Sequence, residues 1–320
     1  MKPIISVTIM FFVLWRRRRE KNIMLMDVFK LIRVEHWVKN LLIFMPPFFL
    51  GNLLDKENVL LALPAFFAFS LVASAIYVFN DIKDVEKDRL HPKKCNRPIA
   101  SGKISIGVGY GFAFFLFLSG FALAIWASSI VLAIFAMLIY VISNVAYSAR
   151  FKNTPIVDIF ILAFGFVIRV FYGGFYFGVP ISSWMFLSVF SGALYFACGK
   201  RMNELRQIGF EGETRSVLRS YSQRFLDAHY YMFCGLTILF YSLWTITRSN
   251  QYSVSKLALT IPILIGILAR YNLLIESDKC DGDPVPVLLH DRLLICAVAL
   301  FGLVNAVILY WGDYLPKVTY

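Results

Sequence analysis

The sequence predicts an all-α polytopic membrane protein, a bundle of about nine transmembrane helices. The first observation is composition, because 59% of the 320 residues are hydrophobic, only 16% are charged and the mean hydropathy is +0.67. A soluble globular domain contains fewer apolar and more charged residues. The second observation is that apolar runs near the length that crosses a bilayer recur along the whole chain. The third is an uneven distribution of basic residues between the two sides of these runs.

The nine expected spans cover residues 38–55, 58–80, 106–126, 128–147, 156–178, 182–199, 229–247, 255–275 and 293–312. The first is the weakest, because Pro46 and Pro47 interrupt it and Lys39 and Asn40 begin it. The next three carry no charged residue, and the fifth contains one aspartate and one arginine. The longest polar stretches are loops of about 25 to 30 residues, too short for a soluble domain. We therefore expect one transmembrane domain over residues 26–320.

The net charge of +12 is explained by membrane topology without nucleic acid. With the N-terminus inside, 27 of the 32 Lys and Arg residues fall on the cytoplasmic side. This is the positive-inside bias, and it orients the chain in a cytoplasmic membrane. Nine spans that start inside place the C-terminus outside.

Residues 1–25 form a separate N-terminal segment with two readings. The apolar run 3–15 is followed, not preceded, by Arg16–Arg19, an order that is wrong for a cleaved secretory signal. The segment is either an interfacial helix anchored by arginines or upstream of a true start at Met24 or Met26. We assign it no function.

Cysteine and histidine do not indicate a metal or disulfide framework. The five cysteines are far apart without a CxxC pair, and the four histidines are scattered. Metal chemistry in this chain would therefore use oxygen ligands.

One polar stretch stands out, at the end of the second span. Asn80, Asp81, Asp84 and Asp88 follow one another at steps of one, three and four residues. If the helix continues past the membrane edge, the three aspartates share one face and Asn80 lies one turn behind Asp84. Like charges on one face repel, and a bound divalent cation would reverse that balance. Mg²⁺ takes one or two carboxylates and completes its shell with water and phosphate oxygens.

The plain reading of this stretch is a solvated helix end whose acids pair with neighbouring bases. A basic patch with Lys93, Lys94 and Arg97 follows directly, however. Oxygen donors on one face beside cations favour a site for Mg²⁺ and a diphosphate, with Asn80, Asp81, Asp84 and Asp88 as metal ligands and the three aspartates as catalytic residues.

At this point the residues resemble a family. "NDIKDVEKD" and the following "HPKKCNRPIASG" are similar to the Asp-rich motif of the UbiA superfamily of intramembrane prenyltransferases. "RVEHWVKNLLIFMPPFF", "YSARFKNTPIVDIFILAFGFVIRV" and "KRMNEL" resemble its branch of polyprenyl-phosphate phosphoribosyltransferases. The resemblance covers roughly residues 26–312 and implies a nine-helix bundle whose active site opens to the cytoplasm.

The chain departs from the wider superfamily in the loop between the sixth and seventh spans. Typical members carry a second Asp-rich motif there, whereas this loop has no DxxxD pair. It is instead rich in Lys200, Arg201, Arg206, Arg215 and Arg219. Basic side chains in place of a second Asp-rich motif suit a substrate that has more phosphate groups, and binds less metal, than a prenyl diphosphate. Phosphoribosyl pyrophosphate fits that description.

The expected reaction is transfer of the 5-phosphoribosyl group from phosphoribosyl pyrophosphate to a polyprenyl phosphate, with release of pyrophosphate. The lipid phosphate is already an anion at neutral pH, so no strong general base is required. Mg²⁺ would act as Lewis acid and template, and basic side chains would neutralise the remaining charge. The expected substrate-binding residues are Lys39, Tyr77, Lys94, Arg97, Tyr147, Arg150, Lys152, Asp158, Arg169, Lys200 and Arg201.

Several of these residues also have plain structural readings. Lys39 and Tyr77 suit the membrane edge as snorkelling and belt side chains, and Arg150 and Lys152 suit positive-inside charge. Asp158 and Arg169, eleven residues apart in the fifth span, share a helix face in the membrane, where ionisable groups usually face a cavity. Arg169 either contacts the lipid phosphate or holds a structural pair inside the bundle.

Two other functions compete with this one. A prenyltransferase that uses a prenyl diphosphate donor and an aromatic or lipid acceptor would favour two Asp-rich motifs. A lipid-phosphate transporter would favour internal repeats or broken helices at corresponding positions, and neither is evident. The expected partners are the polyprenyl phosphate, phosphoribosyl pyrophosphate and the bilayer, without nucleic acid; a homo-oligomer is compatible with the sequence.

Overall fold

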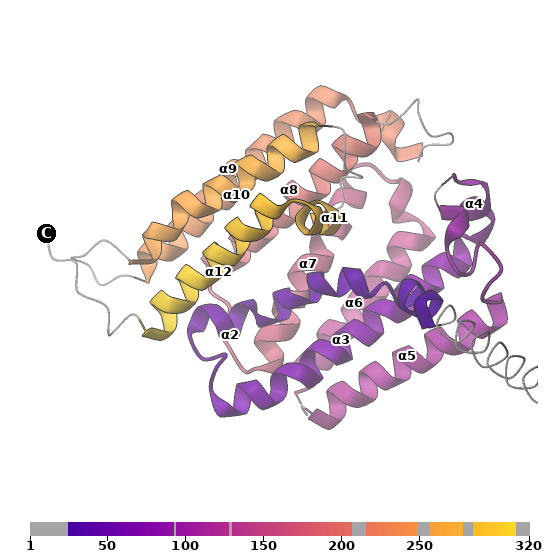
Figure 1. The fold of residues 1–320 in the computed structure, drawn as a ribbon, viewed down its shortest axis with the longest axis horizontal. Helices are drawn as coiled ribbons and strands as arrows, with labels where there is room; N and C mark the ends of the chain where they lie inside the picture. Colours follow the sequence, from indigo (N-terminus) through magenta and orange to yellow (C-terminus); the bar gives the residue numbers. More distant parts are fainter. Residues whose placement is uncertain are drawn as a thin grey trace, which may run out of the picture.

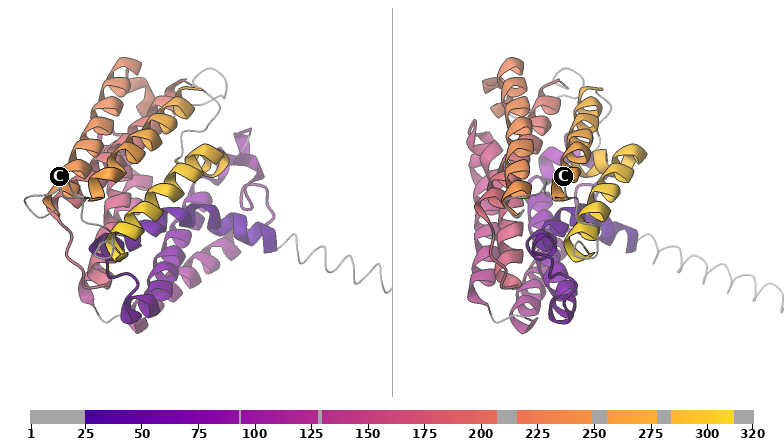
Figure 2. Two further views of the ribbon diagram at one scale, coloured as in Figure 1. Left: turned by 60° about the vertical axis from the view of Figure 1, so that its left-hand side comes forward. Right: turned by 90° about the vertical axis from the view of Figure 1, so that its left-hand side faces the viewer.

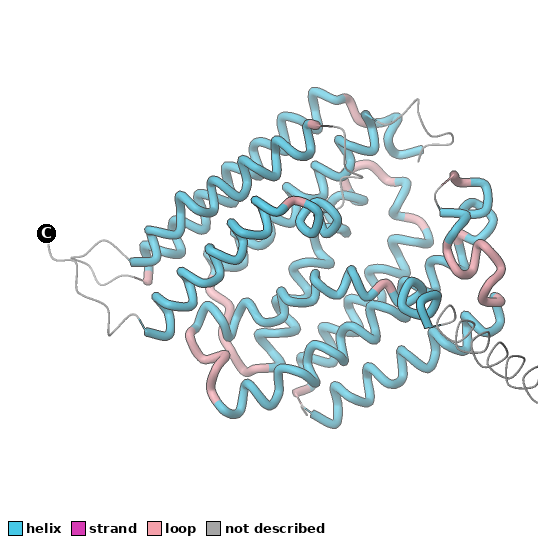
Figure 3. The backbone as a smooth tube through the Cα atoms, in the orientation of Figure 1, coloured by secondary structure: helices cyan, strands magenta, loops and turns pink. Residues whose placement is uncertain are grey.

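The computed structural model describes residues 25–92, 94–127, 130–206, 216–248, 256–277 and 284–311. Residues 1–24 of the expected N-terminal segment, Lys93, and residues 207–215 of the polar loop after the sixth span, which include Arg215, lie outside these residues. Over the described ranges the chain is helical without strands, and the predicted fold class is confirmed (Figures 1 and 3).

The helices follow one another through short connections. Residues 25–32 are helical and are followed by η1 (Val34–Phe44), α2 (Met45–Leu50), α3 (Lys56–Lys83), α4 (Val85–Leu90), η2 (Lys94–Asn96), α5 (Ile106–Ala127), α6 (Val131–Ala149), η3 (Phe151–Asn153), α7 (Val157–Tyr176), α8 (Ser183–Arg206), η4 (Ser216–Ser220), α9 (Gln223–Thr247), η5 (Lys256–Thr260), α10 (Ile261–Glu276), α11 (Pro284–His290) and α12 (Arg292–Trp311).

Within the described residues, seven helices are long and apolar enough to cross a membrane, and they coincide with seven of the nine expected spans. The expected span 182–199 corresponds to the first part of α8, which continues into charged residues at its C-terminal end. The expected span 38–55 is the irregular one. Its residues form a 3₁₀ helix and a short α-helix that ends at Leu50, where Gly51 with φ 89° caps the C-terminus. The prolines explain this irregularity, since each removes a backbone donor.

Two groups of helices make up the bundle, with α7 between them (Figures 1 and 2). In the N-terminal group α3 packs along α5 and contacts α6, and in the C-terminal group α8 packs along α9. Because α7 contacts α6, α8 and η1, its two ends contribute to different apolar clusters. A glycine is required where it crosses η1, since a Cβ on Gly173 would collide with the carbonyl oxygen of Ile43.

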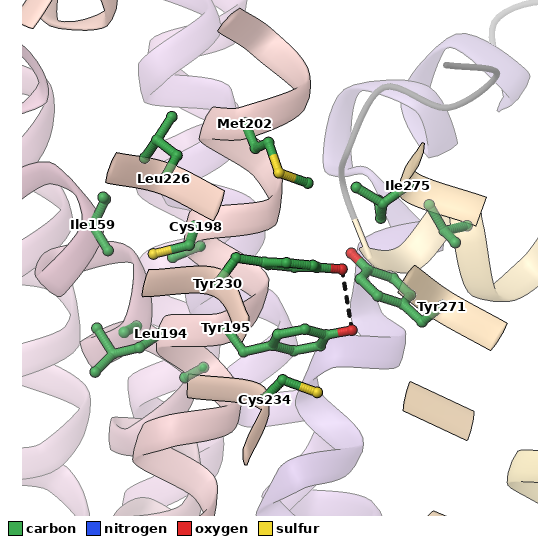
Figure 4. Packing of buried hydrophobic residues seen from close by; sticks show 14 of the residues in the cluster. Ile159, Leu194, Tyr195, Cys198, Met202, Leu226, Tyr230, Cys234, Tyr271 and Ile275 are labelled. Atoms are coloured by element: carbon green, nitrogen blue, oxygen red, sulfur yellow. Dashed lines mark hydrogen bonds between the residues drawn. The ribbon is translucent and has the colours of Figure 1, made fainter. Parts of the chain in front are cut away.

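The core of the C-terminal group includes stacked tyrosines (Figure 4). The rings of Tyr195 and Tyr230 lie 4.5 Å apart at 20°, and the Tyr230 hydroxyl donates to the Tyr195 hydroxyl at 3.2 Å. The Tyr195 hydroxyl donates to Asn272 Oδ1 on α10, and the Tyr230 hydroxyl lies 2.7 Å from the same oxygen, where it can donate in place of its bond to Tyr195. These hydrogen bonds satisfy polar atoms that would otherwise be costly inside an apolar core.

Candidate active site

The Asp-rich motif lies where α3 gives way to α4. Helix α3 ends at Lys83, and Asp84 separates it from α4 with φ −96° and ψ 9°. The four-residue hydrogen-bonding pattern nevertheless continues, from Asp84 N to Asn80 O at 2.9 Å and from Asp88 N to Asp84 O at 2.8 Å. The motif residues therefore keep nearly helical spacing past the end of α3.

The acidic residues of the motif face two different sets of partners. Asp81 and Asp88, seven residues apart, both accept from Arg97 Nη1, at 3.1 and 2.6 Å. Their side chains are only 3% and 6% exposed. Arg97 on the following loop thus neutralises two buried carboxylates at once.

Asn80 and Asp84 face the C-terminal end of α6 instead. Ser148 donates to Asn80 Oδ1 at 2.7 Å, and Lys152 in η3 forms an ion pair with Asp84 at 3.1 Å. The Asp84 side chain is 36% exposed, far more than those of the other two aspartates. In this arrangement Asp81 and Asp88 are paired with Arg97 and Asp84 is paired with Lys152. A metal shared by all three carboxylates stays a prediction.

Arg33 is the residue of this site that sequence reasoning missed. Its Nη2 lies 2.5 Å from Asp81 Oδ1, and its guanidinium carbon lies 5.0 Å from the centre of the Tyr77 ring. Its backbone is left-handed, with φ 51°, where the helix of residues 25–32 meets η1. A non-glycine residue in that region is uncommon and often marks a functional site. The only sequence signal was its place in the "RVEHWVKN" stretch.

Other expected binding residues belong to the segments that flank this site in the sequence. Tyr77 is partly buried, and its ring centre lies 5.6 Å from that of His36. Lys39 is partly buried in η1, and Lys94 is partly buried at the start of η2, where its backbone N–H donates to His91 Nδ1 at 3.3 Å. Arg150 is exposed just before η3.

A second cluster of charged residues lies where the C-terminal ends of α6 and α8 meet the N-terminal end of α7, and the side chains of its two central members, Asp158 and Arg201, are fully buried. Arg201 Nε lies 2.5 Å from Asp158 Oδ2, and the rest of the guanidinium donates to Glu204 Oε2 at 2.5 Å and to the Tyr147 hydroxyl at 2.9 Å. Tyr221 donates to Asp158 Oδ1 at 2.6 Å. Since each nitrogen of Arg201 has an internal partner, this placement favours a positioning role over direct contact with substrate. Lys200, one residue earlier, is partly buried.

Arg169 is separated from Asp158 although the two share a helix face. It is buried, and its guanidinium donates to Asn40 Oδ1 at 2.8 Å, to the Gly165 carbonyl at 2.6 Å and to the Tyr140 hydroxyl at 3.2 Å. The arginine thereby ties α7 to η1 and α6 inside the bundle. This arrangement supports the structural alternative for Arg169.

An apolar cavity of about 200 Å³ lies between η1, α2 and the C-terminal helices. Leu42, Met45 and Phe166 contribute to one side, and Gly192 and Trp244 to the other. Such a lining suits a hydrocarbon ligand rather than a charged one.

The donors fit a hard divalent cation only in part. Over the described ranges, no three Asp, Glu, His or Cys side chains are grouped as metal ligands. Asn80 and Asp84 present two oxygen donors one turn apart at the most exposed part of the motif, which suits an ion that takes one or two protein ligands and completes its shell with phosphate oxygens. Asp81 and Asp88 would first have to exchange their arginine partners.

Comparison with proteins of known structure shows the same fold. A UbiA homolog from Archaeoglobus fulgidus bound to DMAPP and Mg²⁺ superimposes with a TM-score of 0.65 at 19% identity, over 89% of this chain and 97% of that one. A digeranylgeranylglyceryl phosphate synthase structure matches with a TM-score of 0.62 at 21% identity, over 90% of this chain and 99% of that one.

Curated sequences are more similar. The decaprenyl-phosphate phosphoribosyltransferase of Mycolicibacterium smegmatis is 32% identical over 88% of this chain and 92% of its own length. The protein of that name from Mycobacterium tuberculosis is 34% identical over 88% and 94%, and that from Corynebacterium glutamicum is 32% identical over 87% and 86%. The profile of the UbiA prenyltransferase family matches residues 44–284, and the chain is therefore a multi-pass membrane enzyme that belongs to this family.

Proposed function

We propose that the protein transfers the 5-phosphoribosyl group from phosphoribosyl pyrophosphate to a polyprenyl phosphate at the cytoplasmic face of the cytoplasmic membrane. The observation that carries the proposal is the 32–34% identity, over most of both chains, to proteins named decaprenyl-phosphate phosphoribosyltransferase. The charges of the site support it independently.

Besides the acidic motif, the chain has a predominantly basic stretch from Lys200 to Arg219. At the C-terminal end of α8, Glu204 is paired with Arg201 at 2.5 Å, and Arg206 lies 3.9 Å from Asp227 in the first turns of α9. Glu211 and Glu213 lie outside the described residues. A donor that carries a 5-phosphate besides its pyrophosphate suits this excess of cations, because lysine and arginine bind phosphate directly.

In the proposed reaction a phosphate oxygen of the lipid forms a bond to C1 of the ribose. The bond between C1 and the pyrophosphate oxygen breaks, and pyrophosphate leaves with the electron pair. A divalent cation held by Asn80 and Asp84 would supply Lewis-acid stabilisation of the departing charge. Lys152 and Arg97, already beside the motif, would neutralise phosphate oxygens and hold two mutually repelling anions together.

The lipid chain has a candidate place as well. The cavity beside Leu42 and Phe166 lies among helices that cross the membrane, and its lining is almost entirely apolar. We propose that it takes isoprene units of the acceptor, while the phosphate stays at the membrane edge with the motif.

The competing reaction is prenyl transfer from a prenyl diphosphate. One observation favours it: a stretch of 107 residues is 36% identical to the digeranylgeranylglyceryl phosphate synthase of Saccharolobus solfataricus. That stretch is 32% of this chain, much less than the phosphoribosyltransferase relatives match.

The deciding experiment uses purified protein in lipid nanodiscs with Mg²⁺. One arm contains radiolabelled phosphoribosyl pyrophosphate and polyprenyl phosphate, and the other contains a radiolabelled prenyl diphosphate with an aromatic or glycerol-phosphate acceptor. We expect a labelled lipid and stoichiometric pyrophosphate only in the first arm, with Asp84→Asn as the inactive control. Product only in the second arm would refute the proposal.

A further inference from the structure

The connection between α6 and α7 contains an unfavourable turn. Ile156 has φ 69° and ψ −50°, and Val157 N donates to Pro155 O at 2.8 Å across it. These values define a γ-turn of the rare, strained form with positive φ at its centre. A β-branched residue is especially disfavoured there. Because Ile156 is exposed, with 52% of its surface accessible, apolar packing does not explain the conformation.

A hydroxyl group holds this turn. The Tyr221 hydroxyl accepts from Ile156 N at 2.5 Å and donates to Asp158 Oδ1 at 2.6 Å. Asp158 is in turn fixed by its buried ion pair with Arg201. We name Tyr221, Asp158 and Arg201 the clasp. Burial of the hydroxyl raises the pKa of Tyr221, which favours the protonated form that donates to Asp158.

The other end of the same connection reaches the Asp-rich motif. Lys152, four residues before Ile156, pairs with Asp84, and Ser148 at the end of α6 donates to Asn80. Residues 148–156 therefore run from the two most accessible donors of the motif to the clasp. A strained backbone persists only where its surroundings enforce it, and such strain is concentrated at functional sites.

We propose that Tyr221 is a positioning residue: through the turn at Ile156 it holds Lys152 beside Asp84, and it thereby sets the affinity of the site for the diphosphate group of the substrate. This inference deepens the proposed function. It rests on that function in one respect, namely that the ligand of the site carries a diphosphate group. Both candidate donors meet that condition, so inorganic pyrophosphate is a suitable probe.

The test measures binding of inorganic pyrophosphate with Mg²⁺ by titration calorimetry in nanodiscs. Tyr221→Phe removes only the hydroxyl, and we expect it to weaken pyrophosphate binding about three- to tenfold, as the loss of one hydrogen bond next to charged groups does. The matched control is Tyr231→Phe. This change also removes a hydroxyl that donates to a carboxylate, here that of Glu276, but Tyr231 is an exposed residue of α9. We expect it to bind as the wild type does.

A double variant separates positioning from general support of the fold. If Tyr221 acts through Lys152, Tyr221→Phe should weaken binding no further once Lys152→Met is present. Replacement of Ile156 by glycine, which adopts positive φ without strain, should restore part of the affinity in Tyr221→Phe. A variant that only loosens the fold would lower Tm without this pattern.

The wild-type protein provides a test that does not depend on any variant folding. Hydrogen exchange at residues 150–157 should slow when pyrophosphate and Mg²⁺ bind. Unchanged exchange there, wild-type affinity in Tyr221→Phe, full additivity with Lys152→Met, or no binding to the wild type would each overturn the inference. Failure of the proposed function would instead leave the pyrophosphate results intact while phosphoribosyl pyrophosphate is not consumed.

Discussion

Arg97 is the residue whose loss should most disturb the Asp-rich motif. Its Nη1 bridges Asp81 and Asp88, at 3.1 and 2.6 Å. Arg97→Gln would leave Asp81 with Arg33, which lies 2.5 Å away, but it would remove the cationic partner recorded for Asp88. The Asp88 side chain is 6% exposed, so water could not replace the lost partner.

The magnitude follows from burial. Removal of one partner from a fully buried ion pair costs about 3–5 kcal/mol, and an exposed pair contributes about 0–1 kcal/mol. Arg97 is 30% exposed while both carboxylates are buried, so we expect a loss of about 2 to 3 kcal/mol in the free energy of unfolding. That corresponds to a decrease of roughly 4 to 9 °C in Tm.

The assay is thermal unfolding in detergent, followed by tryptophan fluorescence. The control is Arg89→Gln, since Arg89 pairs with Glu86 at 3.0 Å with both side chains exposed, and it should cost about 0.5 kcal/mol or less. Asp88→Asn in the Arg97→Gln background should recover much of the loss, because it removes the charge left without a partner. The reasoning is refuted if Arg97→Gln costs no more than Arg89→Gln, or if Asp88→Asn makes the double variant still less stable.

Four further outcomes are expected. A reporter that is active only in the cytoplasm should work when fused after Gly102 and fail at the C-terminus; activity at the C-terminus would show an even number of spans. Asp84→Ala should abolish turnover and change Tm by about 2 °C or less, because the Asp84 side chain is partly exposed. A chelator should inactivate the wild type reversibly, and full activity in excess chelator would exclude the metal site. Lys200→Ala should raise the KM for phosphoribosyl pyrophosphate about ten- to hundredfold and leave that for the lipid unchanged; a defect confined to the lipid would reject this role. Hydrogen bonds from Arg270 hold the pKa of Asp291 below its usual value. The ionised Asp291 therefore stabilises the folded protein at a pH above its unfolded pKa, and this stability should be lost as the pH falls through the lower pKa of the folded state. An Asp291→Asn variant whose Tm depends on acidic pH as that of the wild type does would contradict this.

Much of the architecture follows from local sequence. A run of about 20 apolar residues has few alternatives to a helix, because in a bilayer each backbone polar group must be satisfied within its own segment. The expected span 106–126 accordingly lies in a helix with bounds Ile106–Ala127. The prediction is less good where local chemistry is mixed: the prolines make the first span irregular, and α8 continues into charged residues.

The candidate site shows where sequence reasoning ends. The spacing of Asn80, Asp84 and their neighbours located the acidic motif, but it did not show which acids are buried or how they are paired. Those properties depend on residues that are distant in sequence, since Arg33 lies 48 positions before Asp81 and Lys152 lies 68 after Asp84.

The sequence by itself determined the fold class, seven of the nine expected spans and the position of the acids around the end of α3, because hydrophobicity and helical periodicity are local properties. Only the tertiary structure decided that Arg97 bridges Asp81 and Asp88 and that Arg201 is turned inward to Asp158. A long cationic side chain can reach any acid within several ångströms, and which acid lies there depends on how the helices pack.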